Sequence, residues 1–545
     1  MPETDPTAAA AATGVDDAPA SPRPPPPTRA EVAQLAAVLA VWCGIAAYAT
    51  FRLDGFFGVD AYFHITLAEK LAEHGLRMQT FSWAAYSVWN DSYFDKEWLF
   101  HVILRWVLPF GRETGPKLLV VAMNAGIVAS MWWVARGLWR QRGYLWLLLT
   151  LVAALGINAE RIMLVRPHVL SVIFLFVCIG AMLYRRPVVL AITMLLYAWS
   201  HTGHWQMVGL ALVYDCAYAL FTDDGRLRPR REWRRLPLMT LVVAGVTVGA
   251  AILHPHFPVN VKGLWIQNVL VVTDYAAGGD SAVHGARPQE LRHLPLDQLW
   301  RLLGLVLAAH VAVLIHAIKT RVRQPRALLV MAVYSLMFFV MMLLIRRFYE
   351  YWVPTSVLLI VGYCLQHNLL RGLASRWKAL AAVAIVGLTV ATALRSRETV
   401  VASPRFQESG DWIAHHLEPD EIVFTASWSQ PPALFYVASQ QRFLVFLDPM
   451  FMYRRDPEVY VWWDRTRFGK IKDDEVTMMV RNYFHSRCVF VTTPNPTRPS
   501  PTDRFYDQLM AAPDARLVAR DFDGGCVFLL ADHPLPPPPA EGEAP

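Results

Sequence analysis

The stretch "FFGVDAYFHITLAEKLAEHG", residues 56–75, follows an apolar segment at about 33–53 that is long enough to cross a bilayer. Asp60 and His64 are four residues apart, and a helix places two side chains with this spacing on one face. An aspartate at the start of a helix often caps it, and capping alone is a sufficient reason for Asp60. The alternative is a polar site at the point where the chain leaves the lipid.

The residues after Asp60 predict an amphipathic helix over 61–74 that ends at Gly75. Its apolar positions share a face with Asp60 and His64, and its charged positions point away. The apolar positions are Phe63, Leu67 and Leu71, and the charged ones are Glu69, Lys70 and Glu73. This pattern is typical of a helix that lies at the membrane interface.

Composition indicates a polytopic membrane protein. Of the 545 residues, 55% are hydrophobic and only 17% are charged, whereas a soluble enzyme would need more charge. The net charge of +7 comes from basic residues in short loops between apolar runs. They form no stripe interleaved with aromatic side chains, so we expect no nucleic-acid partner.

Apolar segments recur along residues 31–396, and we expect this region to form the membrane domain. They predict about eleven helices, or up to about thirteen, because two segments are short enough to be broken or re-entrant. The segments lie near 33–53, 117–139, 142–159, 167–184, 187–200, 203–221, 236–255, 297–318, 326–346, 350–367 and 377–395.

Five basic loops alternate with these segments, and all five fall on the side of the N-terminus. They are "RGLWRQR" (136–142), "YRRP" (184–187), "DDGRLRPRREWRR" (223–235), "KTRVRQPR" (319–326) and "RGLASRWK" (371–378). By the positive-inside rule this side is the cytoplasm. The first outward loop, 54–116, and everything after residue 396 therefore face away from the cytoplasm.

The unusual polar residues gather on the outward face. They are Asp54, Asp60, His64, Asp95, Glu97, Glu160, His168, His201, His204, His254, His256 and Glu290. Ionisable groups at span ends are costly unless they are paired, so such a cluster is a site hypothesis. The alternative is that they are solvated loop residues.

The C-terminal part, 404–533, has a different composition and predicts an α/β domain outside the cytoplasm. Its strand-like stretches are "EIVFTA", "RFLVFL", "CVFVTT", "ARLVAR" and "CVFLLA". Cys488 and Cys526 each begin one of these stretches, so a disulfide between them is one alternative if the domain faces an oxidising compartment. Residues 1–30 and 534–545 are rich in Ala or Pro and predict disordered tails.

The first loop also carries a resemblance. It reads "VDAYFHITLAEKLAEHG", then "FSW", and closes with "DKEWLFHVIL". This run resembles the first outward loop of a large group of bacterial GT-C-type membrane proteins, and more distantly the "D-x-Y-x-H" loop of oligosaccharyltransferase catalytic subunits. Five further segments fit in order, so the likeness covers roughly residues 50–360. They are "VRPHVLSVIFLF" (165–176), "WSHTGHWQMVGLAL" (199–212), "HPHFP" (254–258), "RPQELRHLP" (287–295) and "RRFYEYWVP" (346–354).

The resemblance implies a multi-pass glycosyltransferase in the bacterial inner membrane, with its C-terminal domain in the periplasm. Such enzymes take a sugar from a polyprenyl-phosphate-linked donor, and the acceptor here is an unidentified glycan, lipid or protein. The mechanism implied is a single displacement with inversion. The alternative is a non-catalytic GT-C-like envelope protein or a transporter that binds a polar or lipid-linked ligand.

The first-loop Asp of this family is a metal ligand or a catalytic carboxylate, and the matching position is Asp60. The fifth-loop Glu has its counterpart in Glu290. The acidic D-x-D-like pair of oligosaccharyltransferases is absent from "INAERIMLVRPH" (157–168), so Glu160 or His168 would have to substitute. In place of W-W-D-Y-G the chain has "FTASWSQPP" (424–432), and "VWWDRT" (461–466) is expected in a helix.

These residue types allow specific chemistry. Asp60, together with Glu290, can act as a general base. If the enzyme depends on a metal, Asp60, Glu160 and Glu290 can hold Mg²⁺ or Mn²⁺ through their oxygen atoms. Arg346 and Arg347 suit a donor phosphate, although interfacial snorkelling explains them equally well.

The histidines allow two interpretations. We expect His64, His201 and His204 to contact the donor phosphate. His201, His204, His254 and His256 also suggest a transition-metal site, with structural hydrogen bonding as the simpler alternative.

Overall fold

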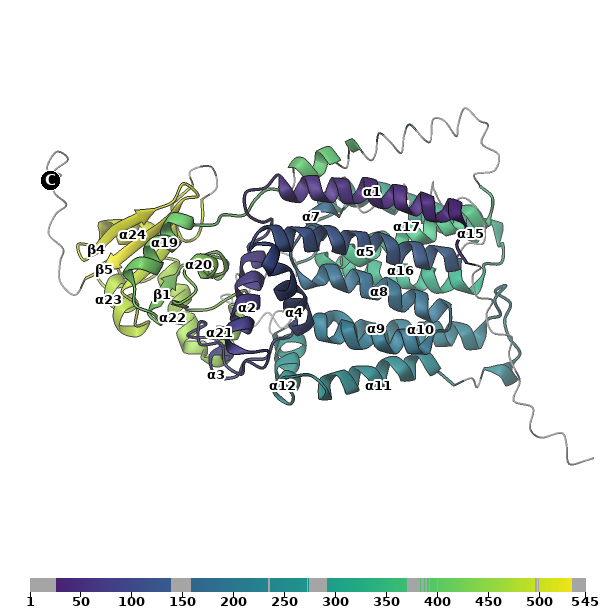
Figure 1. The fold of residues 1–545 in the computed structure, drawn as a ribbon, viewed down its shortest axis with the longest axis horizontal. Coiled ribbons are helices and arrows are strands. Elements are labelled where there is room, and N and C mark those ends of the chain that lie inside the picture. Colours follow the sequence, from purple (N-terminus) through teal and green to yellow (C-terminus); the bar gives the residue numbers. More distant parts are fainter. Residues whose placement is uncertain are drawn as a thin grey trace, which may run out of the picture.

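The computed structural model describes residues 26–138, 158–233, 236–271, 273, 292–369, 383, 387, 390–391, 393–398 and 400–531 except 496 and 498. Glu290 lies outside these residues, as do most of the spans predicted at 142–159 and 377–395. A bundle of long helices forms one end of the molecule and a C-terminal sheet domain forms the other (Figure 1).

Nine helices form the described bundle. They are α1 (Arg29–Phe51), α5 (Thr114–Leu138), α8 (Pro167–Leu183), α9 (Pro187–Ser200), α10 (Gln206–Leu220), α11 (Leu238–Ile252), α15 (Leu296–Thr320), α16 (Arg326–Leu344) and α17 (Tyr349–Gln366). Five helical stretches among the described residues are long and apolar enough to cross a membrane: Arg29–Phe51, Thr114–Leu138, Leu303–Thr320, Arg326–Leu344 and Arg346–Gln366. Shorter apolar helices accompany them, so the chain is a multi-pass membrane protein, and the number of spans stays a prediction.

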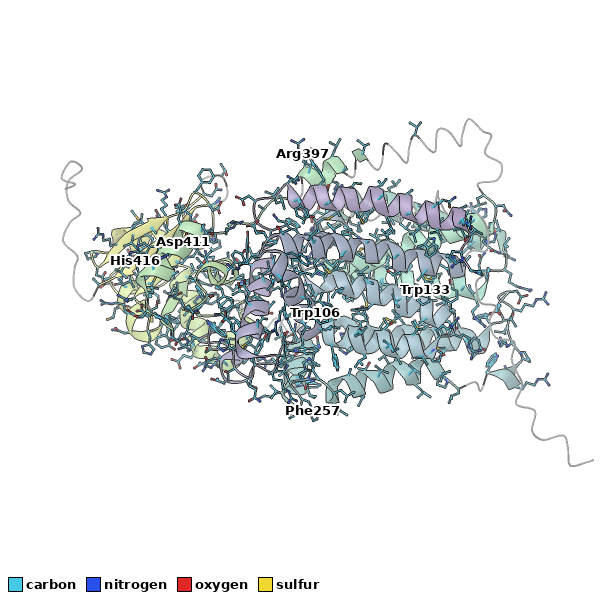
Figure 2. All side chains as sticks on the ribbon, viewed as in Figure 1. Trp106, Trp133, Phe257, Arg397, Asp411 and His416 are labelled. Carbon is cyan, nitrogen blue, oxygen red and sulfur yellow. The ribbon has the colours of Figure 1, made fainter. Side chains whose placement is uncertain are left out.

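The outer surface of the bundle is apolar, as a lipid-facing surface must be. Leu305 on α15 is 75% exposed, and Val248 and Leu344 are also exposed. Trp106 and Phe257, both exposed, lie at the end of the bundle nearest the C-terminal domain (Figure 2). Aromatic side chains at this level are typical of a membrane–water interface.

Basic loops meet at one place in the bundle. The guanidinium groups of Arg185, Arg228 and Arg326 all lie over the ring of Tyr218, at 4.3, 5.7 and 4.5 Å from its centroid. These arginines come from three of the five basic loops. The three loops therefore share one end of the bundle, and its cytoplasmic orientation stays a prediction.

Short helices and turns lie in the connections between the long helices. The first loop holds α2 (Asp60–His74), α3 (Val88–Asp91) and α4 (Trp98–Val107), followed by a 3-10 turn at Leu108–Phe110. Later connections hold α7 (Ala159–Ile162), α12 (Val259–Trp265), a π-helical turn at Ile266–Leu270, and 3-10 turns at Thr202–Trp205, Arg230–Glu232 and Arg346–Phe348.

The helix α2 corrects one expectation. It ends at Gly75 as predicted, where φ is +88°. However, it packs between α4 and α20 (Pro431–Val437) of the C-terminal domain instead of lying at the lipid surface. Lys70, expected to point away, is buried over the Trp83 ring and bonds Glu73 at 2.9 Å. An amphipathic pattern cannot tell a lipid surface from a protein surface, since both are apolar.

The C-terminal domain is built on a five-stranded sheet with strand order β2-β1-β3-β5-β4. Its strands match the five predicted stretches, with β5 beginning one residue earlier than predicted: β1 (Ile422–Thr425), β2 (Arg442–Phe443), β3 (Cys488–Thr492), β4 (Ala515–Arg520) and β5 (Gly525–Leu530). Strands β2, β1 and β3 are parallel, and β5 runs antiparallel to both β3 and β4. The helices are α19 (Gln407–His416), α20, α21 (Met450–Arg455), α22 (Pro457–Arg467), α23 (Val476–Met478) with a π-helical turn at Met479–Tyr483, and α24 (Asp503–Ala511).

Alternate residues of β3 belong to two different cores. Phe490 packs with the core that includes α19 and α20 and continues into the membrane domain. Val489 packs with the core that includes α22 and α24. Cys488 belongs to the first core and Cys526 to the second, so the two thiols lie on opposite faces of the sheet. Both cysteines are free, and no disulfide joins them.

The first loop extends this sheet at its β2 edge. Phe443 N–H donates to Trp83 O at 2.7 Å, and Ala85 N–H donates to Phe443 O at 2.8 Å. Ala84 pairs with Phe443 in parallel orientation. The loop and the C-terminal domain are therefore one hydrogen-bonded unit, which fixes the space between that domain and the bundle.

Candidate functional site

A cavity of about 870 Å³ lies between the helix ends and the C-terminal domain. The first loop supplies Asp60, His64, Lys96 and Glu97 to its wall, and the start of α8 supplies Arg166 and His168. The loop after β1 supplies Ser427, Trp428 and Ser429, all within the "FTASWSQPP" stretch. The cavity is thus built from both parts of the molecule.

Most of the predicted site residues share this cavity. Asp60, His64, Glu160, His201, Arg346 and Arg347 all line it. His204 lines a separate small pocket with Trp199 and His254, and Glu290 lies outside the described residues. The structure brings these six side chains together, and their roles stay predictions.

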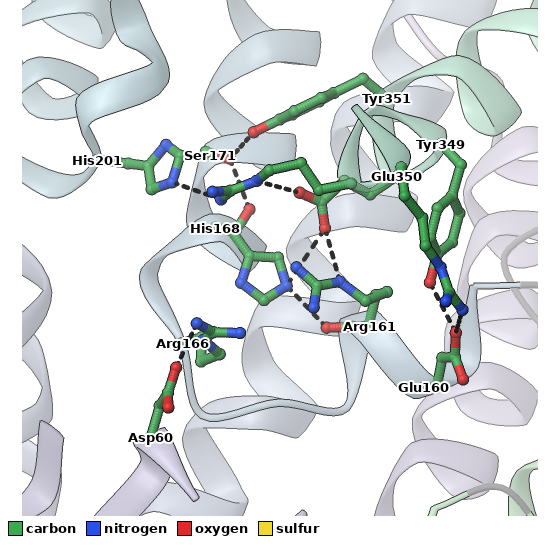
Figure 3. Close-up of polar contacts among 12 residues, drawn as sticks. Asp60, Glu160, Arg161, Arg166, His168, Ser171, His201, Tyr349, Glu350 and Tyr351 are labelled. Atoms are coloured by element: carbon green, nitrogen blue, oxygen red, sulfur yellow. Dashed lines mark hydrogen bonds and ion pairs between the residues drawn. The ribbon is translucent and has the colours of Figure 1, made fainter. Parts of the chain in front are cut away.

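Asp60 is not a helix cap. It is the first residue of α2 rather than its N-cap, and no side-chain capping bond is made there. Its carboxylate instead forms an ion pair with Arg166, the residue before α8 (Figure 3). The capping interpretation is therefore wrong, and Asp60 joins the loop before α4 to the connection before α8 electrostatically.

Glu350, near the start of α17, is the buried centre of a second ionic group. Its carboxylate lies 3.2 Å from Arg161 Nε, 3.5 Å from His168 Nε2 and 3.8 Å from Arg347 Nε (Figure 3). Its side chain has no solvent exposure. This carboxylate holds in place two of the arginines on the cavity wall.

Glu160 lies at the edge of the same group. Tyr349 donates its hydroxyl hydrogen to Glu160 Oε1 at 2.8 Å, and Arg346 Nη2 lies 3.9 Å from the same oxygen. Arg347 Nη2 lies 3.5 Å from His201 Nε2. Burial and then Arg347 lower the pKa of His201 well below its usual value, which keeps its ring neutral at pH 7.

A buried chain of hydrogen bonds leads away from the cavity through the first loop. His64 Nδ1 lies 2.8 Å from His101 Nε2, and His101 Nδ1 lies 2.8 Å from Asp95 Oδ2. Burial alone would raise the pKa of Asp95, but His101 and the backbone N–H of Glu97 lower it. The ionised Asp95 therefore accepts the Nδ1 proton of His101, which fixes the tautomer of that ring.

The cavity favours an anion. Six basic side chains line it, against four acidic ones. The basic ones are Lys96, Arg161, Arg166, Arg292, Arg346 and Arg347, and the acidic ones are Asp60, Glu97, Glu160 and Asp448. Guanidinium groups match the geometry of phosphate, so a phosphate group is the ligand that this wall suits best.

The predicted carboxylate metal site stays a prediction, because Glu290 lies outside the described residues. Asp60 lies against Arg166, and Glu160 lies against Tyr349 and Arg346. Each of these contacts uses one oxygen of its carboxylate, an oxygen that Mg²⁺ or Mn²⁺ would also use as a ligand. The two acids also belong to no metal-sized group of His, Cys, Asp or Glu in the described part of the chain.

Three important residues were missed from the sequence. Arg166 stands in "VRPH" two residues before His168, and its pairing with Asp60 depends on tertiary contact. The sequence did point to Glu350, because an acidic residue at the start of an apolar span is rarely without a function. His101 follows Glu97 by four residues, which is a helical ligand spacing.

No family model matches the chain, and no curated protein matches it. Solved structures do match. The archaeal oligosaccharyltransferase AglB from Archaeoglobus fulgidus, in complex with an inhibitory peptide and a dolichol-phosphate, aligns with a TM-score of 0.59 and 12% identity over 85% of this chain and 70% of that one. A complex of the same organism's oligosaccharyltransferase with Zn and sulfate aligns with a TM-score of 0.54 and 12% identity, over 84% and 68% of the two chains.

A third structure is similar over nearly the whole chain. The arabinofuranosyltransferase AftD from Mycobacteria aligns with a TM-score of 0.53 and 13% identity, over 91% of this chain. The chain spans only 42% of the length of that protein. At this level of identity the matches establish architecture, and the chain therefore has the fold of the GT-C membrane glycosyltransferases, as a distant structural relative of AglB and AftD.

Proposed function

We propose that the chain is a membrane glycosyltransferase of the bacterial inner membrane, which transfers a sugar from a polyprenyl-phosphate-linked donor to an acceptor at the periplasmic face. The observation that carries the proposal is the cavity between the bundle and the C-terminal domain, where Asp60 meets Arg166 among a surplus of basic side chains. The GT-C fold and the dolichol-phosphate in the AglB complex support the same donor class.

The charges on the cavity wall suggest which residues bind the donor phosphate and which one takes the proton. The donor phosphate binds Arg346 and Arg347, whose positions are fixed by Glu160 and Glu350. Arg166 also faces the cavity, so an incoming phosphate competes with Asp60 for its guanidinium. Asp60 is then free to take the proton of the acceptor hydroxyl as the acceptor attacks the anomeric carbon. Attack opposite the leaving phosphate inverts that carbon.

A second candidate function rests on the same ion pair. Because Arg166 neutralises Asp60, the cavity could bind a lipid-linked or polar ligand without transferring sugar. The chain would then be a non-catalytic GT-C-like envelope protein or a transporter.

Replacement of Asp60 by Asn distinguishes the two. Asparagine keeps the size of the side chain but is not a base, so we expect transfer of labelled sugar from polyprenyl-phosphate donors to fall by about 100-fold or more. Asp54→Asn is the matched control, since Asp54 stands six residues earlier, is almost fully exposed and does not line the cavity. Wild-type transfer by the Asp60→Asn protein would refute the catalytic assignment. Ligand uptake without a covalent product would favour the second candidate.

A further inference from the structure

Three ligand atoms converge in the first loop, beside Asp60 but separate from it. His64 Nδ1, His101 Nε2 and a Glu97 carboxylate oxygen lie within 4.8 Å of one another, the one such group in the described part of the chain. His64 Nδ1 is 2.8 Å from His101 Nε2 and 3.9 Å from Glu97 Oε2. His64 and His101 are almost completely buried, and Glu97 is nearly so.

The local sequence explains this convergence. Glu97 immediately precedes α4 and His101 is four residues further on, so both project from the same side of that helix. The helix α2 packs against α4 and brings His64 to meet them. The spacing of Glu97 and His101 is local, and the third ligand is a product of the tertiary fold.

The carboxylate of Asp95 orients one of the three ligands, His101. Asp95 accepts the Nδ1 proton of His101, and its Oδ1 also accepts the backbone N–H of Glu97 at 3.0 Å. The Nε2 lone pair of His101 is thereby aimed at the centre of the group. Metal-binding histidines in proteins are held in this way by a second carboxylate.

We propose that His64, Glu97 and His101 bind one transition-metal ion of the zinc class. Ligands at about 2.0–2.1 Å from a tetrahedral zinc are about 3.3 Å apart, and the two measured distances lie on either side of this value. Two imidazole nitrogens with one carboxylate select zinc-class ions over Mg²⁺. When the metal binds, the proton of His64 moves from Nδ1 to Nε2, so that Nδ1 offers its lone pair and both rings stay neutral.

The site is of the catalytic type, because three protein ligands leave one position of a tetrahedral ion for another group. His64 and Glu97 line the cavity while His101 stands behind them, so this fourth position faces the cavity and takes water or a phosphate oxygen. Lys96 Nζ lies 3.9 Å from Glu97 Oε1, which leaves Oε2 for the metal. The proposal does not depend on sugar transfer.

The test measures metal binding by the purified full-length protein in detergent. After chelator treatment, Zn²⁺ titration by calorimetry and metal analysis by mass spectrometry should give one ion per chain. His101→Ala should abolish this stoichiometric binding, and Asp95→Asn should weaken it by about 10–100-fold. Glu97→Gln, which keeps the shape of the side chain, should also weaken it. Co²⁺ in place of Zn²⁺ should show the intense visible absorption of a four-coordinate site.

His254→Ala is the matched control. His254 belongs to the other histidine group, beside His204 and His256, and should leave the stoichiometry unchanged. Loss of the ion in His254→Ala alone, or equal binding by wild type and His101→Ala, would overturn the proposal. Gel filtration and thermal unfolding of each variant show that the chain has folded. Because metal binding and sugar transfer are measured separately, either proposal can fail without the other.

Discussion

At the scale of single residues, buried charges organise the cavity wall. Glu350 has no exposed side-chain surface and faces Arg161, His168 and Arg347 within 3.8 Å. The Asp60–Arg166 pair, by contrast, lies open to the cavity. Glu350 is therefore a structural centre of the wall, whereas the carboxylate of Asp60, paired with Arg166, faces the cavity.

Glu350→Gln should destabilise the protein strongly. The change removes the buried carboxylate charge and leaves Arg161, which is only 13% exposed, without its acidic partner; breaking a buried ion pair typically costs about 3–5 kcal/mol. Thermal unfolding in detergent measures the effect. Asp297→Asn is the matched carboxylate-to-amide control, because Asp297 pairs with Arg301 on an exposed surface and should give no measurable change. Equal effects of the two variants would show that the Glu350 group is not a structural centre.

At the scale of elements, an ion cluster joins the start of α5 to the chain just before α19. Arg405 bonds Glu113 and lies 3.3 Å from Asp54, while Lys117 lies 3.3 Å from Glu113. Burial alone would raise the pKa of Glu113, but Arg405 and Lys117 lower it below its usual 4.5. The cluster ties the C-terminal domain to the bundle.

This cluster predicts a pH dependence of stability. A carboxyl group whose folded pKa is depressed stabilises the fold above its unfolded pKa, and this contribution is lost as the pH falls through the folded value. Glu113 should therefore stabilise the protein fully above about pH 4.5 and progressively less below it. Thermal unfolding of wild type and Glu113→Gln across pH 3–7 should show the larger acid-induced loss in wild type. Parallel curves would mean that the cluster does not contribute.

At the scale of the whole molecule, the first loop and the C-terminal domain share one aromatic core. The Phe81 ring lies 5.9 Å from Phe63 of α2, 5.8 Å from Phe435 of α20 and 5.5 Å from Phe446. The same loop extends the sheet through its bonds to Phe443. We therefore expect the loop and the domain to unfold together.

Phe81→Ala should uncouple them. Removal of a fully buried ring costs about 3–5 kcal/mol, and this ring packs between two parts of the chain. Limited proteolysis should cut the segment around 400–406 in the variant before the wild type is cut. Phe522→Ala, at an exposed position, is the control. Equal protection of Phe81→Ala and wild type would show that the domains hold together without this core.

The sequence alone determined the broad architecture, because its signals are local. Apolar runs of spanning length mark bundle helices such as α1 and α16. Short apolar runs mark all five strands, and the first loop carries the family likeness that the GT-C fold bears out. Period and composition are enough for these conclusions, since each depends on neighbouring residues.

Only the tertiary structure decided which polar residues meet. The sequence placed Asp60 on an outward helix, but its partner Arg166 is 106 positions away and was not predicted. Glu350 and Arg161 also meet from distant parts of the sequence, as do His64 and His101, and neither contact was predicted. The face of α2 was misassigned for a related reason, because an apolar stripe fits lipid and protein equally well. Charge pairing and ligand convergence depend on which segments meet in space, and no local pattern encodes that.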